Sequence, residues 1–235
     1  MSSAEQFAER NGAFWRTTAP MLDPLIRSAN LGPMRFAPPL DGVSPPQRAA
    51  LVAEAAFAMF ASSTAHVRKA SESRQQLEAR ARRRVAVLVG TSVQGVSSLS
   101  GADWEEASTL SLRLADYARN LLEEESASIL LSPALPGCGF VDAAEADFSV
   151  GSTLVEVKAV GRTFRGTDIR QVLVYAALDE AANRPYAWSR VALCNPRQGT
   201  TLMWTLDDLC IEVSGRPRSE VLAAIIAEMS SGPDY

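Results

Sequence analysis

The chain has 235 residues, of which 47% are hydrophobic and 21% are charged, which is the composition of an ordinary globular protein. Its formal net charge of −4 excludes a surface that is positive throughout, so any contact with nucleic acid must come from a local basic patch. No apolar run approaches the roughly 20 residues that span a bilayer, and the opening MSSAEQFAERNG lacks a basic and apolar leader. We therefore expect a cytoplasmic protein with no membrane contact.

Cysteine and histidine are too scarce for several kinds of site. Cys138, Cys194 and Cys210 lie far apart, so we expect neither a disulfide framework nor a paired-cysteine metal site. A four-cysteine iron-sulfur cluster also lacks ligands. The single histidine, His66, excludes a two-histidine zinc site and makes a histidine general base a poor candidate.

The first half of the chain is predicted to be helical. Seven prolines in residues 1 to 46 disfavour long regular helices there. Residues 47 to 90 are rich in Ala, Leu, Arg and Glu, which favours a helix that bends or splits near Ser62 and Ser63. Gly and Ser then dominate residues 90 to 101, which predicts a connection. We place the boundary there, with a helical N-terminal region at 1 to 100 and a core at 101 to 235.

The second half mixes strands and helices. Residues 103 to 125 carry apolar side chains at helical spacing, and residues 128 to 160 show β-branched runs separated by Pro-Gly and Val-Gly-Ser turns. A helix is predicted at 167 to 183, strands at 188 to 194 and 200 to 206, and a last helix at 219 to 230. This order predicts an α/β (α+β) fold in which helices flank a mixed central sheet.

Lys158 lies among acidic residues in the middle of the strand region. It is one of only two lysines, whereas arginine supplies 21 of the 23 basic residues. Side chains alternate along a strand, so Glu156 and Lys158 share one face while Val155 and Val157 face the core. A Val-Gly-Ser-Thr turn folds Asp147 back toward Glu156. We therefore expect the three charged groups to converge.

Two neighbouring carboxylates and an amine suit phosphodiester hydrolysis. The carboxylates repel each other, and a divalent cation such as Mg²⁺ relieves the repulsion. A metal ion polarises a phosphoryl oxygen and lowers the pKa of bound water, while an ammonium orients that water or balances negative charge. The same spacing on a strand also occurs in plain solvated ion pairs, which is the structural alternative.

The wider pattern resembles a known family. Asp147, eight intervening residues, Glu156-Val157-Lys158 and then Gln171-x-x-x-Tyr175 resemble the PD-(D/E)XK nuclease superfamily, especially its RecB-like branch with the QxxxY motif, over about residues 127 to 206. The resemblance implies a restriction-endonuclease-like core and Mg²⁺ or Mn²⁺ as cofactor. It implies Asp147, Glu156 and the backbone carbonyl of Val157 as metal ligands, and Lys158 as the catalytic lysine. Gln171 and Tyr175 would support the site and touch the nucleic-acid strand.

Two positions next to this pattern need comment. Ala146 stands where many members have proline before the aspartate. Many members also take an acid from an upstream helix, and we favour Glu106 for that role. The competing glutamates are Glu105, Glu123, Glu124 and Glu125.

Two basic segments could hold the phosphates of a nucleic acid. Arg162, Arg165 and Arg170 follow the lysine and are candidates for phosphate contacts, while Asp168 among them is expected to cap a helix. The second segment, Arg68 to Arg84, is either a solvated helix face or a backbone contact with steep salt dependence. No base-reading module is evident, so sequence preference stays open.

We predict a Mg²⁺- or Mn²⁺-dependent deoxyribonuclease, with RNA and end versus internal cutting left open. The resemblance suggests bacterial antiviral defence or DNA repair, with a helicase or ATPase as partner because this sequence has no P-loop. The apolar N-terminal helices permit a homodimer. One alternative is a catalytically silent or partner-dependent nucleic-acid-binding or assembly subunit with the same fold. The other is a helical interaction protein whose residues 1 to 125 bind a partner.

Overall fold

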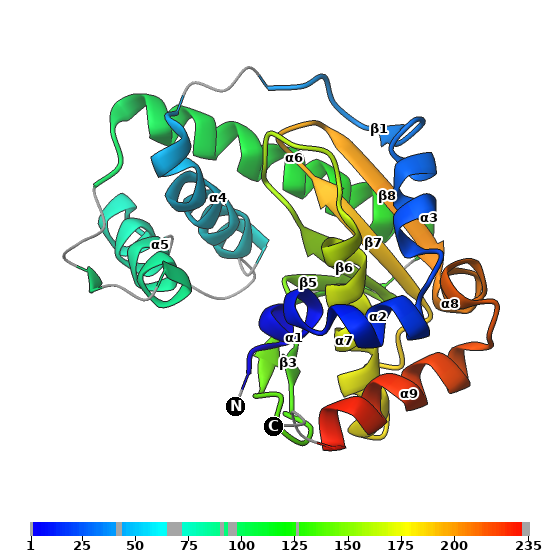
Figure 1. The fold of residues 1–235 in the computed structure, drawn as a ribbon. Helices are drawn as coiled ribbons and strands as arrows, with labels where there is room; N and C mark the ends of the chain where they lie inside the picture. Colours follow the sequence, from blue (N-terminus) through cyan, green and yellow to red (C-terminus); the bar gives the residue numbers. More distant parts are fainter. Residues whose placement is uncertain are drawn as a thin grey trace.

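A mixed sheet lies between two groups of helices (Figure 1). The computed structural model describes residues 2–40, 44–64, 72–89, 92–93, 98–125 and 127–231. Its helices are α1 (Ala4–Arg10), α2 (Gly12–Thr18), α3 (Leu22–Ala29), the 3₁₀ turn η1 (Pro46–Arg48), α4 (Ala49–Thr64), α5 (Arg74–Val89), α6 (Gly101–Glu125), α7 (Gly166–Ala181), α8 (Leu206–Ser214) and α9 (Arg218–Ser231). Its strands are β1 (Met34–Arg35), β2 (Ile129–Leu131), β3 (Ala134–Leu135), β4 (Ala144–Glu145), β5 (Phe148–Val150), β6 (Thr153–Val157), β7 (Arg190–Asn195) and β8 (Thr200–Thr205).

The main sheet has six strands in the order β1-β8-β7-β6-β5-β2. Strands β6 and β7 are parallel and are connected through α7, whereas the other neighbours are antiparallel. Strands β3 and β4 form a separate pair. The predicted mixed sheet flanked by helices is therefore confirmed.

Both faces of the sheet are buried, as the alternation along β6 shows. Leu154 packs in one core with Ile169 of α7, and Val155 packs in another with Leu114 of α6. Glu156 shares the face of Leu154, because side chains two residues apart point the same way in a strand. The sheet thus directs Glu156 toward α7.

The N-terminal helices do not pack as one unit. Phe7, Trp15 and Leu22, from α1 to α3, are buried in the same core as α7 and α9. Helix α4 instead packs against α5 and α6. A domain boundary near residue 100 stays a prediction, but the packing groups the elements differently from the predicted segments.

Most elements predicted after residue 46 are present, and one described helix in that part of the chain was missed. The long helical segment is split as expected, since α4 ends at Thr64 and α5 begins at Arg74. The missed helix is α8, whose first turn is capped by the Thr205 hydroxyl, which accepts from the Asp208 N–H at 3.0 Å. His66 and Arg68 lie outside the described residues. Within the described ranges, no helix is long and apolar enough to cross a membrane.

A two-residue turn between β5 and β6 sets the register of the site. Gly151 has a positive φ of 51°, a backbone conformation that residues other than glycine rarely adopt. A Cβ at this position would also collide with the Glu125 carboxylate. Phe148 pairs with Val155, so Asp147 and Glu156 are the next opposed positions of the ladder. The predicted hairpin is confirmed.

Candidate active site

The two carboxylates of the predicted site lie side by side at the end of this hairpin. Asp147 Oδ2 accepts a hydrogen bond from the Val157 N–H at 2.7 Å, which fixes one oxygen against β6. Glu156 is only 4% exposed, whereas Asp147 is half-buried and lines a cleft. One carboxylate is therefore internal and the other reaches solvent.

Lys158 begins a series of hydrogen bonds that runs along α7. Its Nζ donates to Glu156 Oε1 at 2.9 Å and to Gln171 Oε1 at 2.6 Å. Gln171 Nε2 in turn donates to the Tyr175 hydroxyl at 2.8 Å. Gln171 and Tyr175 are four residues apart on one face of α7, as the sequence predicts. The helix therefore holds the lysine beside the carboxylates.

Burial and neighbouring charges shift the pKa values of all three charged groups. Burial, together with the negative charge of Asp147, raises the pKa of Glu156 to about 8. Burial also raises the pKa of Asp147 to about 6. Burial alone would lower the pKa of Lys158, but the charge and hydrogen bond of Glu156 outweigh it and raise the pKa above its ordinary value. A raised pKa keeps Lys158 an ammonium at neutral pH, which matches its two donated hydrogen bonds.

The donor set fits a hard divalent cation. Glu156 Oε2 is buried and has no hydrogen-bond partner, so a cation beside it would satisfy an otherwise orphaned oxygen. Asp147, Glu156 and the Val157 carbonyl would hold it. Across the described ranges no three His, Cys, Asp or Glu side chains group as metal ligands. The remaining positions would fall to water, which Mg²⁺ usually retains.

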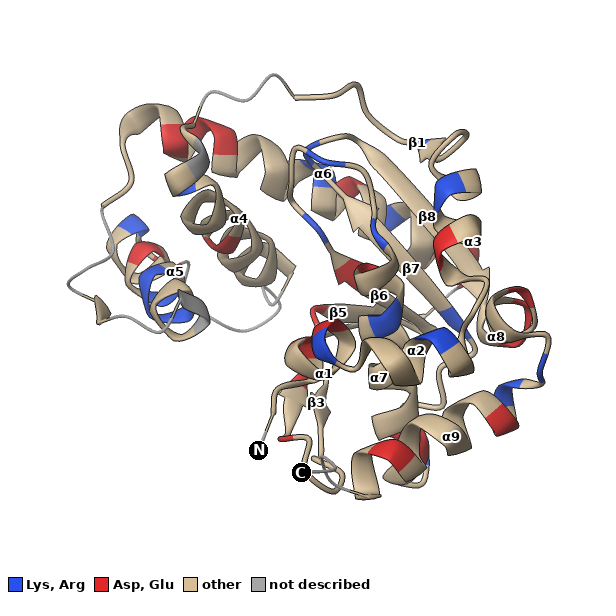
Figure 2. Cartoon of the chain, viewed as in Figure 1, with Lys and Arg blue, Asp and Glu red and all other residues tan. Residues whose placement is uncertain are grey.

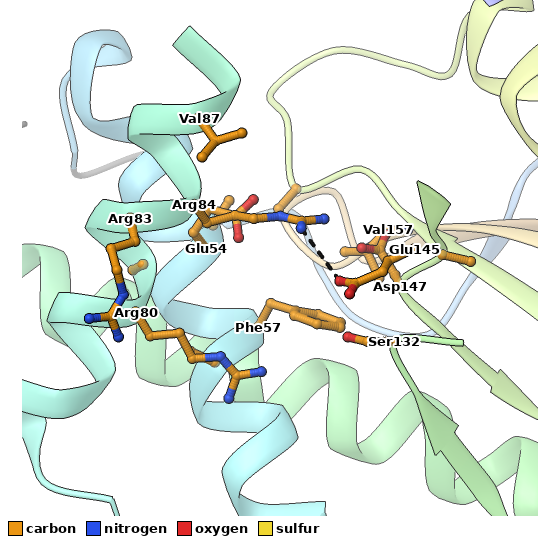
Figure 3. Close-up of a pocket in the computed structure, with 15 residues that line it drawn as sticks. Glu54, Phe57, Arg80, Arg83, Arg84, Val87, Ser132, Glu145, Asp147 and Val157 are labelled. Atoms are coloured by element: carbon orange, nitrogen blue, oxygen red, sulfur yellow. Dashed lines mark hydrogen bonds and ion pairs between the residues drawn. The ribbon is translucent and has the colours of Figure 1, made fainter. Parts of the chain in front are cut away.

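A cleft of about 380 Å³ opens beside Asp147 (Figure 3). One wall comes from α4 and α5, and the other comes from the strand region on either side of β5. The cleft residues are Ala53, Glu54, Phe57, Ala58, Arg80, Ala81, Arg83, Arg84, Val87, Ser132, Glu145, Ala146, Asp147, Val157 and Ala159. A bound molecule would thus touch both halves of the chain.

The structure does not bring Glu106 to the carboxylates. Glu106 is 3% exposed and forms a buried ion pair with Arg197, and its other oxygen accepts from the Ser44 N–H at 2.8 Å. Both oxygens are therefore engaged away from Asp147 and Glu156, which corrects the expected metal role. The other upstream candidates also lie elsewhere: Glu105, Glu123 and Glu124 are exposed, and Glu125 pairs with Arg190.

Glu54 of α4 is the acid that the sequence reasoning missed. It is half-buried in the cleft, and its negative charge contributes to the raised pKa of Asp147. Burial raises its own pKa, while the charge of Arg84 opposes the shift. The sequence did contain a signal for this acid. Glu54 is the only charged residue of α4, whose other residues are apolar or have small side chains.

The predicted nucleic-acid contacts near the lysine mostly have partners within the protein. Gln171 and Tyr175 are each 4% exposed, so they support Lys158 and do not present a surface. Arg162 binds both oxygens of Asp168, at 2.7 and 2.9 Å, and Asp168 caps α7 by accepting from the Arg165 N–H.

Two further arginines complete that segment. The Arg170 guanidinium lies over the Trp15 ring, 5.7 Å from its centroid, and its pKa is lowered by burial. Arg165 is exposed. Of the three arginines after the lysine, Arg165 therefore remains the one whose side chain is open to a phosphate contact.

Comparison with known proteins does not assign the chain to a family. No protein-family model, curated protein or solved structure matched the chain. The likeness to PD-(D/E)XK nucleases therefore depends on the residues themselves and on the geometry that surrounds them.

Proposed function

We propose that this chain is a divalent-metal-dependent nuclease that hydrolyses DNA phosphodiester bonds on a restriction-endonuclease-like core. The observation that carries the proposal is the hydrogen-bonded series Glu156, Lys158, Gln171 and Tyr175. The series lies beside Asp147, which lines the cleft. In PD-(D/E)XK nucleases, which this pattern resembles, the five corresponding side chains act together, and we expect the same of these four residues and Asp147. They come from the β5–β6 hairpin and from α7, and the hydrogen bond from Lys158 to Gln171 joins these two elements.

A purely structural ion pair explains the site less well. Such a pair stabilises a fold only if the remaining polar atoms are satisfied, because removing charges from water is costly. Here Glu156 Oε2 has no partner, and a second carboxylate raises the pKa of Glu156 further. Strongly shifted pKa values at a cleft are typical of functional sites.

Each residue of the site has a separate role in the proposed reaction. A Mg²⁺ or Mn²⁺ ion held by Asp147 and Glu156 would polarise a phosphoryl oxygen and lower the pKa of bound water. Lys158 stays protonated, so it donates hydrogen bonds to the negative charge that develops on the phosphate oxygens. Gln171 fixes the position of the lysine, and the Val157 N–H fixes the orientation of the Asp147 carboxylate.

A cleavage assay tests this proposal. The full chain would be incubated with single- and double-stranded DNA in Mg²⁺, Mn²⁺ or EDTA, beside Lys158→Met and Asp147→Asn. Glu105→Gln is the matched control, because Glu105 is exposed on α6 and does not line the cleft. We expect metal-dependent cleavage by the wild type and the control only. Cleavage by Lys158→Met at the wild-type rate would refute the assignment.

One observation favours a second candidate, a partner-dependent or silent nucleic-acid-binding subunit. Lys158 binds Glu156 Oε1 directly and so occupies one of the carboxylate oxygens that a metal would use. A partner such as a helicase or ATPase would then have to release the lysine. Binding of DNA by the wild type without cleavage in either metal would support this candidate over the first.

A further inference from the structure

We propose that the cleft binds one strand of nucleic acid, with its phosphates on a wall of α5 formed by Arg80, Arg83 and Arg84. This proposal deepens the proposed function, on which it rests only for the identity of the bond that is cut. It specifies the substrate as single-stranded and assigns its binding residues to a helix outside the segment that resembles nucleases.

Helix α5 presents three of its arginines to the cleft. Arg80 lies three residues before Arg83 and four before Arg84, so it neighbours each of them on the helix surface, and all three line the cleft. Figure 2 shows how basic residues gather on α5. The other two arginines of the helix have different partners: Arg74 lies over the Trp104 ring, and Arg82 donates to the Val93 carbonyl at 2.9 Å.

These three guanidinium groups are only weakly engaged. Arg80 lies 3.7 Å from Glu72 and Arg84 lies 3.6 Å from Glu145, and the four side chains are 35 to 54% exposed. In the described part of the chain, Arg83 forms no ion pair. Exposed ion pairs of this kind contribute little to stability, so phosphates can replace the carboxylates at small cost. Arg162 and Arg170 are half-buried and each has a partner within the protein, and this contrast favours the α5 wall as the phosphate site.

The arginine wall continues directly into the candidate active site. Asp147 and Val157 line the same cleft opposite α5, and the charge of Arg84 acts to lower the pKa of Asp147 (Figure 3). Phe57 of α4 lines the cleft between the α5 arginines and Asp147, and its side chain is half-buried. Proteins that bind single strands combine a basic groove with aromatic rings on which bases stack. A strand held by α5 would therefore pass over Asp147 with a base on Phe57.

The size of the cleft favours one strand over a duplex. Arg84 on one wall forms an ion pair with Glu145 on the opposite wall. The width of the cleft at that point is therefore spanned by two side chains. A duplex is far wider, since its major groove alone measures about 12 Å. The volume of about 380 Å³ falls within the range of small-molecule sites and suits a nucleotide-sized group.

Binding of a fluorescent oligodeoxythymidine of about 20 nucleotides tests the inference, measured by anisotropy on the full chain in EDTA over a series of salt concentrations. Each phosphate contact contributes about −0.7 to the slope of log K against log salt for a single strand. We expect the triple variant R80Q/R83Q/R84Q to bind at least tenfold more weakly, with a slope about 2 less steep. Arg119→Gln, an exposed arginine of α6 outside the cleft, is the matched control and should bind as the wild type does.

A second variant acts in the opposite direction and so cannot be explained by misfolding. Glu145→Gln removes the carboxylate that competes for Arg84, and we expect affinity to rise about two- to fivefold. A matching duplex should bind more weakly than the single strand. An oligouridine arm shows whether the site distinguishes RNA from DNA, and binding of either strand supports the inference.

The results separate this inference from the proposed nuclease activity. Arginine-dependent strand binding without cleavage in Mg²⁺ or Mn²⁺ would support the strand site and refute the nuclease. Cleavage by the triple variant with an unchanged KM would support the nuclease and refute the strand site. Tighter binding of duplex than of single strand would also overturn the inference.

Discussion

Glu156 should make the metal-free protein less stable as the pH rises, and Glu156→Gln should remove this effect. The ordinary glutamate pKa of 4.5 is raised to about 8 in the folded protein, so between these values the folded state keeps a proton that the unfolded chain has lost. The free energy of unfolding therefore falls with rising pH across this window. From pH 6.5 to 8 the loss of unfolding free energy is on the order of 1 to 2 kcal/mol, which lowers Tm by a few degrees in a chain of this size.

Thermal unfolding in EDTA at pH 6.5 and pH 8 measures this difference. Wild type should lose those few degrees relative to Glu156→Gln, whereas Glu105→Gln should behave as wild type because Glu105 is exposed. Titrating groups that do not interact with Glu156 cancel in the comparison. Mg²⁺ or Mn²⁺ should stabilise wild type more at pH 8 than at pH 6.5, because a cation binds the ionised carboxylates. Parallel pH profiles for wild type and Glu156→Gln would refute the reasoning about the buried carboxylate.

Four further variants follow from the same contacts. Lys158→Arg keeps the charge but replaces a point donor by a planar fork, so kcat should fall about 10²-fold in cleavage assays. Gln171→Ala removes the hydrogen bond that positions Lys158, and Gln171 itself is not expected to contact the substrate. In steady-state kinetics kcat should therefore fall about tenfold while KM is unchanged. Glu54→Gln should weaken Mg²⁺ activation by about 10-fold or more in a metal titration. Glu106→Gln breaks a buried ion pair and should cost about 3 kcal/mol of unfolding free energy in denaturant titrations, while the metal dependence is retained.

Each of these variants has an outcome that contradicts its reasoning. Full activity of Lys158→Arg would mean that only charge matters, and a rise in KM for Gln171→Ala would place that amide on the substrate. An unchanged metal titration for Glu54→Gln would separate α4 from the site. Loss of metal activation in Glu106→Gln, measured well below its Tm, would restore the role that the sequence first indicated.

The sequence predicts the strand part of the site well because it depends on local rules. A turn at Gly151 and strict alternation along β6 are enough to place Asp147 opposite Glu156 and to put Lys158 on the same side. The four-residue spacing of Gln171 and Tyr175 likewise requires only that α7 is a helix. These relations span few residues, so packing elsewhere does not change them.

The upstream acid could not be assigned in this way. Choosing between Glu106 and Glu54 requires knowing how α4 and α6 lie against the sheet, which depends on long-range packing. Glu106 is in a helix with the expected period, but Arg197 from the turn after β7 binds it. Helix α8 was missed for a local reason, since β8 ends at Thr205 and the same residue caps the helix that begins at Leu206.

The contributions of the N-terminal helices indicate that the site requires residues before position 100. Helix α4 supplies Glu54 and Phe57 to the cleft, and α5 supplies the arginine wall. Helix α1 also reaches the site, because Gln171 Nε2 donates to Glu5 Oε1 at 3.4 Å and the charge of Glu5 helps to raise the pKa of Glu156. A segment cut at residue 100 would keep Lys158 and its carboxylates but lose the facing wall of the cleft. The proposed catalytic residues and the proposed substrate surface therefore come from different halves of one chain, and their contact at the cleft would couple strand binding to cleavage.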